Sequence, residues 1–196
     1  MKQLWALQDI SENPLWKKQI QSRLALKEIN QKVWSETNLF SPIWWLMVVV
    51  FIVMWGLWWK LVDKARLLEI MTYGLMVAIF MMFIDSIATQ SLIWGFPNRL
   101  TPFSPPLIFL DLCVLPVTYM LVYQYCNNWR SFTVAMIITA AILSFVVEPL
   151  AIRLDIFEMY HWSVWLSFPL YLVIGFTFRG IVNGVKAIQV RARRGQ

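Results

Sequence analysis

Three carboxylate residues lie inside stretches that are otherwise apolar, and they are the residues best placed to do chemistry. Asp85, Asp111 and Glu148 each interrupt an apolar run long enough to cross a bilayer. An ionisable side chain at the bilayer centre costs roughly 2.5 to 3.5 kcal/mol on insertion scales, so each acid needs a reason to be there. One interpretation is a shared polar pocket in which burial favours the neutral form of the acids and neighbouring positive charges favour the charged form. The other is that each carboxylate separately reaches headgroups, accepts a helix cap or joins two helices.

The composition indicates the setting of these acids. Of the 196 residues, 59% are hydrophobic and only 14% are charged, against about 25% charged residues in globular chains. The sequence therefore predicts an all-α integral membrane bundle of about five transmembrane helices. We expect an amphipathic N-terminal segment at residues 1–40, a five-span membrane domain at 41–185 and a basic C-terminal tail at 186–196.

Five apolar stretches are the predicted spans, and they cover residues 43–59, 69–90, 105–125, 131–151 and 160–178. The pairs Asn13–Pro14 and Ser41–Pro42 predict the starts of an N-terminal helix and of the first span. The N-terminal helix, expected at residues 14–35, either binds the membrane surface or a partner, or packs on its own bundle.

Other residue patterns within the spans predict local features. Trp44, Trp45, Trp58 and Trp59 bracket the first span, which is typical of interfacial anchors. Pro116 and Pro169 predict kinks in spans three and five. Gly180 and Gly184 form a small-xxx-small pair, a pattern typical of helix packing.

The three acids are predicted to share a depth and a side of the membrane. Because successive spans alternate in direction, all three lie about 5 to 9 Å beneath the surface that carries loops two and four, at 1.5 Å per helical residue. Loop two spans residues 94–106 and loop four residues 153–162. Arg99, Arg153 and His161 are the expected counterions. The candidate pocket residues are Asp85, Asp111, Glu148, Trp94, Arg99, Gln124, Arg153, Tyr160, His161 and Trp162.

Other chemistries find little support in the sequence. His161 is either a hydrogen-bonded loop residue or a metal ligand, but no His or Cys partner has ligand spacing. There is no phosphate-binding glycine loop, zinc pattern or serine elbow, and we expect no cofactor. The net charge of +6 lies mainly in the tails and first loop, which favours membrane lipids over nucleic acid as partners. A protein partner or a second copy of the chain remains an alternative.

Loop one, which joins spans one and two, carries Lys60, Lys64 and Arg66, and loop three, which joins spans three and four, carries Arg130. Together with the basic C-terminal tail, these residues predict that the three segments are cytoplasmic. Five spans then place the N-terminal tail outside the cytoplasm, although that tail carries six Lys or Arg residues of its own. The charge rule and the span count therefore disagree at the N-terminus.

The order of residues 83–125, 144–150 and 160–171 resembles an uncharacterised family of small multi-spanning membrane proteins from spore-forming Gram-positive bacteria. The resemblance covers roughly residues 62–180 and implies the same fold, in the cell membrane, without implying an activity. The shared positions are Asp85, Trp94, Pro97, Pro102, Asp111, Pro116, Gln124, Glu148, Pro149, Trp162 and Pro169.

A shorter stretch, "DSIATQSLIWGF", is similar to lycopene cyclase-type membrane proteins, which convert isoprenoids by acid chemistry. Those cyclases show a Pro with paired acids after this segment, whereas here Pro105 and Pro106 precede an apolar stretch and the single Asp111.

Our leading hypothesis is therefore a non-enzymatic membrane protein whose pocket binds lipid, an ion or a membrane partner. The alternatives are a membrane-embedded enzyme acting on an isoprenoid or lipid, and a small transporter.

Overall fold

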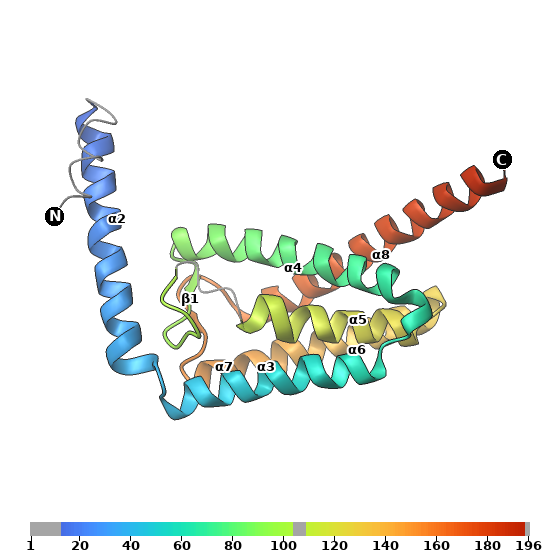
Figure 1. Cartoon of the computed structure of the whole chain (residues 1–196), viewed down its shortest axis with the longest axis horizontal. Helices are drawn as coiled ribbons and strands as arrows, with labels where there is room; N and C mark the ends of the chain where they lie inside the picture. The colour runs from blue at the N-terminus through green and yellow to red at the C-terminus, as the bar shows by residue number, and fades with distance from the viewer. Residues whose placement is uncertain (1–12, 104–108, 195–196) are drawn as a thin grey trace.

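The computed structural model describes residues 13–103 and 109–194. The fold is an all-α bundle, as predicted, in which helical segments run side by side along one axis (Figure 1). The bundle helices are α3 (Pro42–Leu61), α4 (Leu67–Gln90), α5 (Leu115–Tyr125), α6 (Trp129–Ile142), α7 (Glu148–Arg153) and α8 (Val164–Arg194). Their outer faces expose large apolar side chains such as Ile52, Ile79 and Val173, which suits a lipid environment.

Within the described residues, four helical stretches are long and apolar enough to cross a membrane: Pro42–Leu61, Lys64–Gln90, Trp129–Arg153 and Val164–Arg194. They correspond to predicted spans one, two, four and five. The remaining predicted span is a shorter helix that lies among the others and reaches from Leu110 to Tyr125. Its predicted start at Pro105, like Pro106, lies outside the described residues. These features are compatible with a multi-pass membrane protein.

The predicted helix starts are confirmed by cap hydrogen bonds. The Asn13 side chain accepts from the Leu15 amide at 2.9 Å, and Ser41 Oγ accepts from the Trp44 amide at 3.1 Å. In each case proline follows as the first helical residue, where its missing N–H costs nothing.

Two bundle helices contain a wide turn directly before a proline. The Leu115 amide bonds to the Leu110 carbonyl, and the Glu148 amide bonds to the Leu143 carbonyl, five residues back in each case. Pro116 and Pro149 follow immediately and have no amide hydrogen to continue the usual ladder. Such π-type turns often occur at functional sites, and here they hold Asp111 and precede Glu148.

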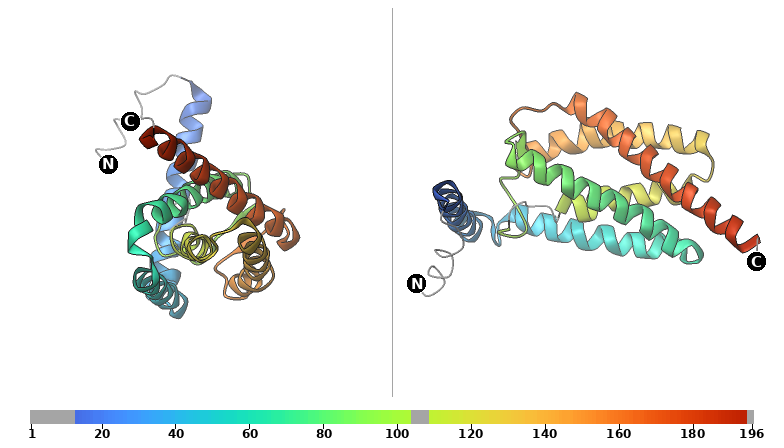
Figure 2. Two further views of the ribbon diagram at one scale, coloured as in Figure 1. Left: turned by 90° about the vertical axis from the view of Figure 1, so that its right-hand side faces the viewer. Right: turned by 90° about the horizontal axis from the view of Figure 1, so that it is seen from above.

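The N-terminal helix α2 (Pro14–Val33) stands across the end of the bundle instead of packing along it (Figures 1 and 2). None of its residues is buried. This geometry disfavours the alternative in which α2 packs on its own bundle. α2 is therefore oriented roughly across the axis along which the bundle helices run.

The last helix, α8, differs from the prediction at both ends. It begins at Val164, four residues after the predicted start at Tyr160, and continues without a break to Arg194 (Figure 2). The predicted basic tail, residues 186–196, is therefore helical as far as Arg194. A change from apolar to charged residues marks where a helix leaves the membrane, but it does not by itself end the helix. Gly180 and Gly184, the predicted packing pair, have no atom within 4 Å of an added Cβ among the described residues.

Two of the four tryptophans expected as interfacial anchors face inward. Trp58 is buried in the bundle core, and Trp44 donates its indole N–H to the Leu100 carbonyl at 3.1 Å. Trp45 and Trp59 are more than half exposed, as anchors would be. Two tryptophans next to each other on a helix are about 100° apart, so a helix that packs on one side buries one of each pair.

Candidate functional site

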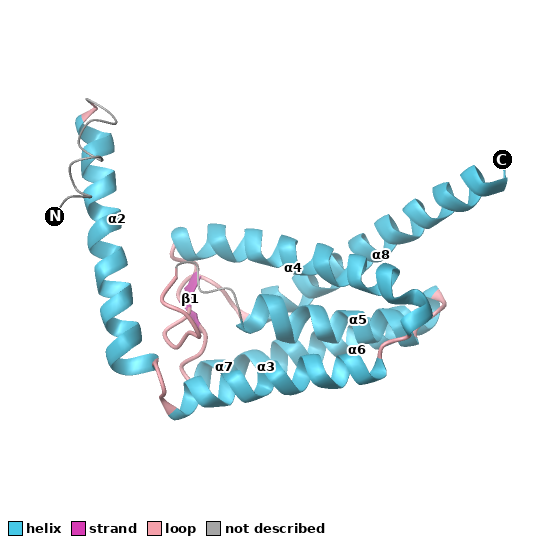
Figure 3. Ribbon diagram, viewed as in Figure 1, coloured by secondary structure: helices cyan, strands magenta, loops and turns pink. Residues whose placement is uncertain are grey.

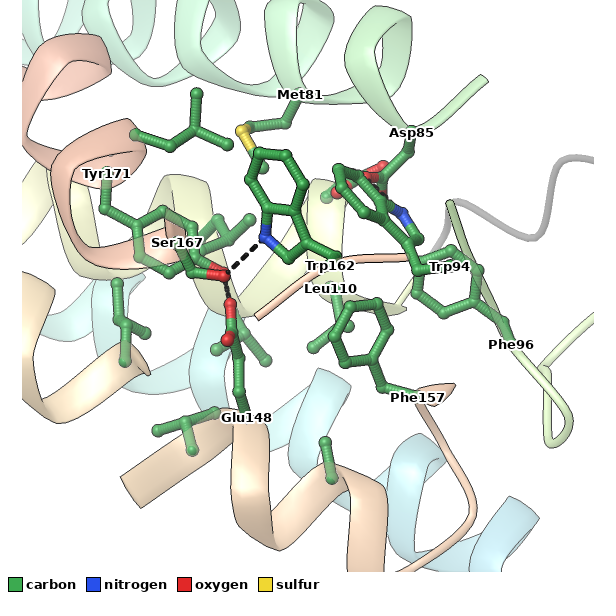
Figure 4. A pocket seen from close by; sticks show the side chains of 17 residues that line it. Met81, Asp85, Trp94, Phe96, Leu110, Glu148, Phe157, Trp162, Ser167 and Tyr171 are labelled. Atoms are coloured by element: carbon green, nitrogen blue, oxygen red, sulfur yellow. Dashed lines mark hydrogen bonds between the residues drawn. The ribbon is translucent and has the colours of Figure 1, made fainter. Parts of the chain in front are cut away.

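The three acids come together at one internal cavity between α4, the two wide turns and α8 (Figure 4). Their residues are 5%, 0% and 7% exposed for Asp85, Asp111 and Glu148, respectively. The cavity has a volume of about 40 Å³. We call it the acid cavity.

Asp85 approaches the acid cavity from the last turns of α4. Its Oδ1 accepts a hydrogen bond of 3.2 Å from Trp94 Nε1. Its carboxyl group also lies within hydrogen-bonding reach of the Asp111 carboxyl group. A bond between two carboxyl groups requires one proton between them, so this pair either shares a proton or needs a cation to separate two negative charges.

Asp111 is the most isolated of the three acids. It sits in the wide turn Leu110–Val114 and is fully buried. Neither of its carboxyl oxygens accepts a hydrogen bond from an N–H or O–H group of the described residues. A buried acceptor without a donor is rare in folded proteins, so Asp111 is the acid of this cavity most in need of a partner.

Glu148 is held from α8. Tyr171 Oη donates to Glu148 Oε1 at 2.7 Å, and the Ser167 hydroxyl lies beside the same carboxyl group. Trp162 Nε1 in turn donates to Ser167 Oγ at 3.0 Å (Figure 4). The second carboxyl oxygen, Oε2, has no partner among the described residues.

Aromatic side chains form the wall of the acid cavity that faces the loops (Figure 4). The rings of Trp94 and Trp162 meet edge to face with centroids 5.2 Å apart, and Phe157 packs against Trp94 at 6.2 Å. The indole N–H of Trp94 donates to Asp85 and that of Trp162 donates to Ser167. Both tryptophan side chains line the cavity.

Loops two and four cover this end of the bundle, and we call residues 93–103 and 154–162 the lid. A two-residue antiparallel ribbon joins them, in which β1 (Trp94–Gly95) pairs with β2 (Glu158–Met159) (Figure 3). The lid is also tied to the N-terminal segment: Asn38 Nδ2 donates to the Pro97 carbonyl at 2.9 Å, and Trp34 and Trp44 both donate to the Leu100 carbonyl.

An open groove of about 690 Å³ lies on the outer side of the lid, beneath α2. Trp94 and Phe96 line both this groove and the acid cavity. These two side chains therefore separate the cavity from the outside.

Several predicted pocket residues lie away from the acid cavity. Arg99 and Tyr160 line the outer groove, where burial lowers the pKa of Arg99, and burial together with the Glu158 hydrogen bond raises the pKa of Tyr160. His161 contacts the Leu92 carbonyl through Nδ1, in line with the hydrogen-bonded alternative, and Arg153 is exposed. No ion pair joins the acids to Arg99, Arg153 or His161.

Gln124 does not belong to the cluster at all. It binds the Asp63 amide and the Leu61 carbonyl at the far end of the bundle. The 13 helical residues between Asp111 and Gln124 separate them by about 20 Å, so one span cannot bring both to the same pocket.

Ser167 and Tyr171 also line the acid cavity, and the sequence pattern was not used to predict them. They are four residues apart on α8, and both face Glu148. Two polar side chains with i, i+4 spacing in an apolar span are the signal that would have found them.

Comparison with family models, curated proteins and solved structures gives no match for this chain. The fold and cavity define a class, a helical bundle compatible with multi-pass membrane insertion and containing a buried acid cluster. In residues 13–103 and 109–194, no group of three His, Cys, Asp or Glu side chains is arranged to hold a metal ion.

Proposed function

We propose that this protein is a non-enzymatic membrane protein that binds a small protonated amine in the acid cavity. The observation that carries the proposal is the set of three buried carboxyl oxygens, both of Asp111 and Oε2 of Glu148, that accept from no N–H or hydroxyl group of the described residues. The Asp85 carboxyl group beside Asp111 can donate to it only when one of the two acids is protonated. An ammonium group carries only donors, three or more in a compact tetrahedral arrangement. It can therefore donate to those carboxyl oxygens of the cavity that have no donor from the protein.

The charge of the cavity supports a cation. Three carboxyl groups line it, and the lysines, arginines and histidine of the described residues form no ion pair with them. Buried charges are stable only when paired, so a bound cation would replace the counterion that the protein lacks. Trp94 and Trp162 favour an amine further, because an indole ring attracts a nearby cation.

The size of the cavity argues against the larger ligands. A volume of about 40 Å³ holds roughly three water-sized molecules at about 10–15 Å³ each, which suits ammonium or methylammonium. Sites for drug-sized molecules have about 300–1,000 Å³, so an isoprenoid or lipid chain would need a much wider cavity. A transporter would need a path to the far face, where the buried rings of Tyr73 and Tyr119 pack instead.

The proposed location is the cell membrane, with loops one and three and the C-terminus in the cytoplasm. The basic residues of these segments support this orientation. The resemblance to a family from Gram-positive bacteria agrees with that location.

The proposal is tested by titrating purified protein in lipid nanodiscs with ammonium, methylammonium, potassium and choline, using calorimetry. We expect the two small amines to bind and choline to be excluded by size. Asp111→Asn keeps the side-chain shape but removes a charge-assisted acceptor worth about 1.5–3 kcal/mol, so the amine affinity should fall about tenfold or more.

Glu28→Gln is the matched control, since Glu28 is an exposed carboxylate on α2. It should leave the affinity unchanged, and thermal unfolding of each variant checks that it folds. The proposal fails if the wild-type protein binds no amine, or if Asp111→Asn and Glu148→Gln bind as tightly as the control.

A further inference from the structure

The far end of the bundle carries a second, chemically opposite site. An open cleft of about 460 Å³ is lined by Arg66, Tyr123, Asn127, Arg179, Asn183 and Lys186, together with Asp63, Glu69 and Cys126. We call it the basic cleft, and we propose that it binds a phosphate group, supplied by the headgroup of an anionic lipid.

Arg179 is the residue that makes this cleft a binding site. It is only 3% exposed, although it carries a permanent charge. Its guanidinium donates to the Cys126 and Asn127 carbonyls at 2.7 and 2.9 Å, and it lies over the Phe132 ring at 4.1 Å. No carboxylate of the described residues pairs with it, and its Nε has no partner.

The acids of the cleft are already occupied by other groups. Glu69 accepts from Arg66 at 3.0 Å, from Lys186 at 2.8 Å and from Tyr123 at 2.6 Å. Asp63 caps the short turn that follows it, through the Ala65 amide at 3.0 Å. The three cations therefore exceed the two carboxylates, and the excess charge lies on the buried Arg179.

The remaining donors suit a phosphate oxygen cluster. Lys186 has three N–H donors, of which Glu69 takes one, and its side chain is 46% exposed toward the cleft mouth. The Arg179 fork already binds two carbonyls, so Arg179 contributes its positive charge, and Lys186 provides the point charge that commonly binds phosphate.

The position of the cleft indicates where the phosphate comes from. It lies at the start of α4, the end of α5 and the second half of α8, at the same end of the bundle as the exposed Lys60, Lys64 and Arg130. Phosphodiester headgroups lie at this level of a bilayer, and anionic lipids are attracted to basic segments there. A lipid thus reaches the cleft without leaving the membrane.

Native mass spectrometry of protein from detergent mixed with phosphatidylglycerol or phosphatidylcholine tests the proposal. We expect phosphatidylglycerol to be retained preferentially. Lys186→Gln should reduce its retention about tenfold, while Lys60→Gln, which removes an exposed lysine outside the cleft, should not change it. Lys186 is used because Arg179→Gln would also remove the hydrogen bonds that join α8 to the Cys126 and Asn127 carbonyls between α5 and α6.

Thermal unfolding in inorganic phosphate forms the second arm and separates the two sources. If inorganic phosphate stabilises the wild-type protein but not Lys186→Gln, a free phosphate is enough to occupy the cleft. If phosphatidylglycerol is retained but inorganic phosphate does not stabilise the protein, the site is specific for lipid. Asp111→Asn should affect neither measurement, so this site can fail or succeed apart from the amine site. Equal retention in wild type, Lys186→Gln and Lys60→Gln, with no phosphate effect, overturns the proposal.

Discussion

At the scale of single residues, proline placement explains how buried carbonyl groups are satisfied. Pro116 has no amide hydrogen, so the Leu112 carbonyl four residues earlier loses its usual helical donor. Trp55 of α3 donates its indole N–H to that carbonyl at 3.0 Å. A residue that looks like one more apolar tryptophan in the first span thus completes the hydrogen bonding of a different helix.

We expect Trp55→Phe to lower the free energy of unfolding by about 1–3 kcal/mol, because it leaves the half-buried Leu112 carbonyl without a donor. Pro116→Ala supplies an amide hydrogen to the same carbonyl. In that background the effect of Trp55→Phe should shrink. Denaturation of the four proteins of this double-mutant cycle in detergent provides the measurement, and equal losses in both backgrounds would contradict the explanation.

At the scale of elements, the lid depends on contacts that come from far away in the sequence. The β1–β2 ribbon is only two residues long in each strand, which is too short to be stable by itself. Asn38, buried at 3% exposure, and the indoles of Trp34 and Trp44 hold loop two from the segment that joins α2 to α3. The N-terminal helix is therefore linked to the cover of the acid cavity.

Asn38→Ala should loosen the lid without unfolding the bundle. Loss of one hydrogen bond of about 1 kcal/mol predicts roughly fivefold faster amide exchange in residues 94–100. Hydrogen–deuterium exchange by mass spectrometry measures this directly. Gln21→Ala, on the exposed face of α2, serves as the control, and unchanged lid exchange in Asn38→Ala would show that the anchor does not restrain the lid.

At the scale of the whole molecule, the two ends of the bundle have opposite character. One end has buried acids, a lid and the transverse helix α2, and the other has a buried guanidinium, basic loops and the extended α8 (Figure 2). The basic residues of loops one and three and of α8 support the proposed orientation, whereas the exposed lysines of α2, at the end with the buried acids, oppose it.

Single-cysteine labelling of intact cells tests the orientation. In a Cys126→Ser background, with Cys113 buried, Phe103→Cys in the lid should react with an impermeant maleimide. Arg130→Cys, in the first turn of α6, should react only after the membrane is permeabilised. The reverse pattern would invert the topology, and equal access from outside would contradict the five-span arrangement.

The sequence by itself determined those features that depend on local chemistry. Apolar length and charge indicated a membrane bundle, the Asn13 and Ser41 caps marked helix starts, and the depth count placed three acids near one surface. Each of these follows from residues close together along the chain, where 1.5 Å per residue and side-chain type are enough information.

Only the tertiary structure decided which side chains meet, because that depends on how each helix is rotated about its axis and on which helices pack together. The wide turns before Pro116 and Pro149 lie where the chain presents Asp111 and Glu148 to the cavity. Gly180 and Gly184 match a packing motif yet face open space, whereas Gly175, without a motif, lies so close to Met136 that a Cβ would fall 2.8 Å from its sulfur. The absent counterions of Asp111 and Arg179 could likewise be recognised only once their neighbours were in place, since a missing partner is a property of three-dimensional packing.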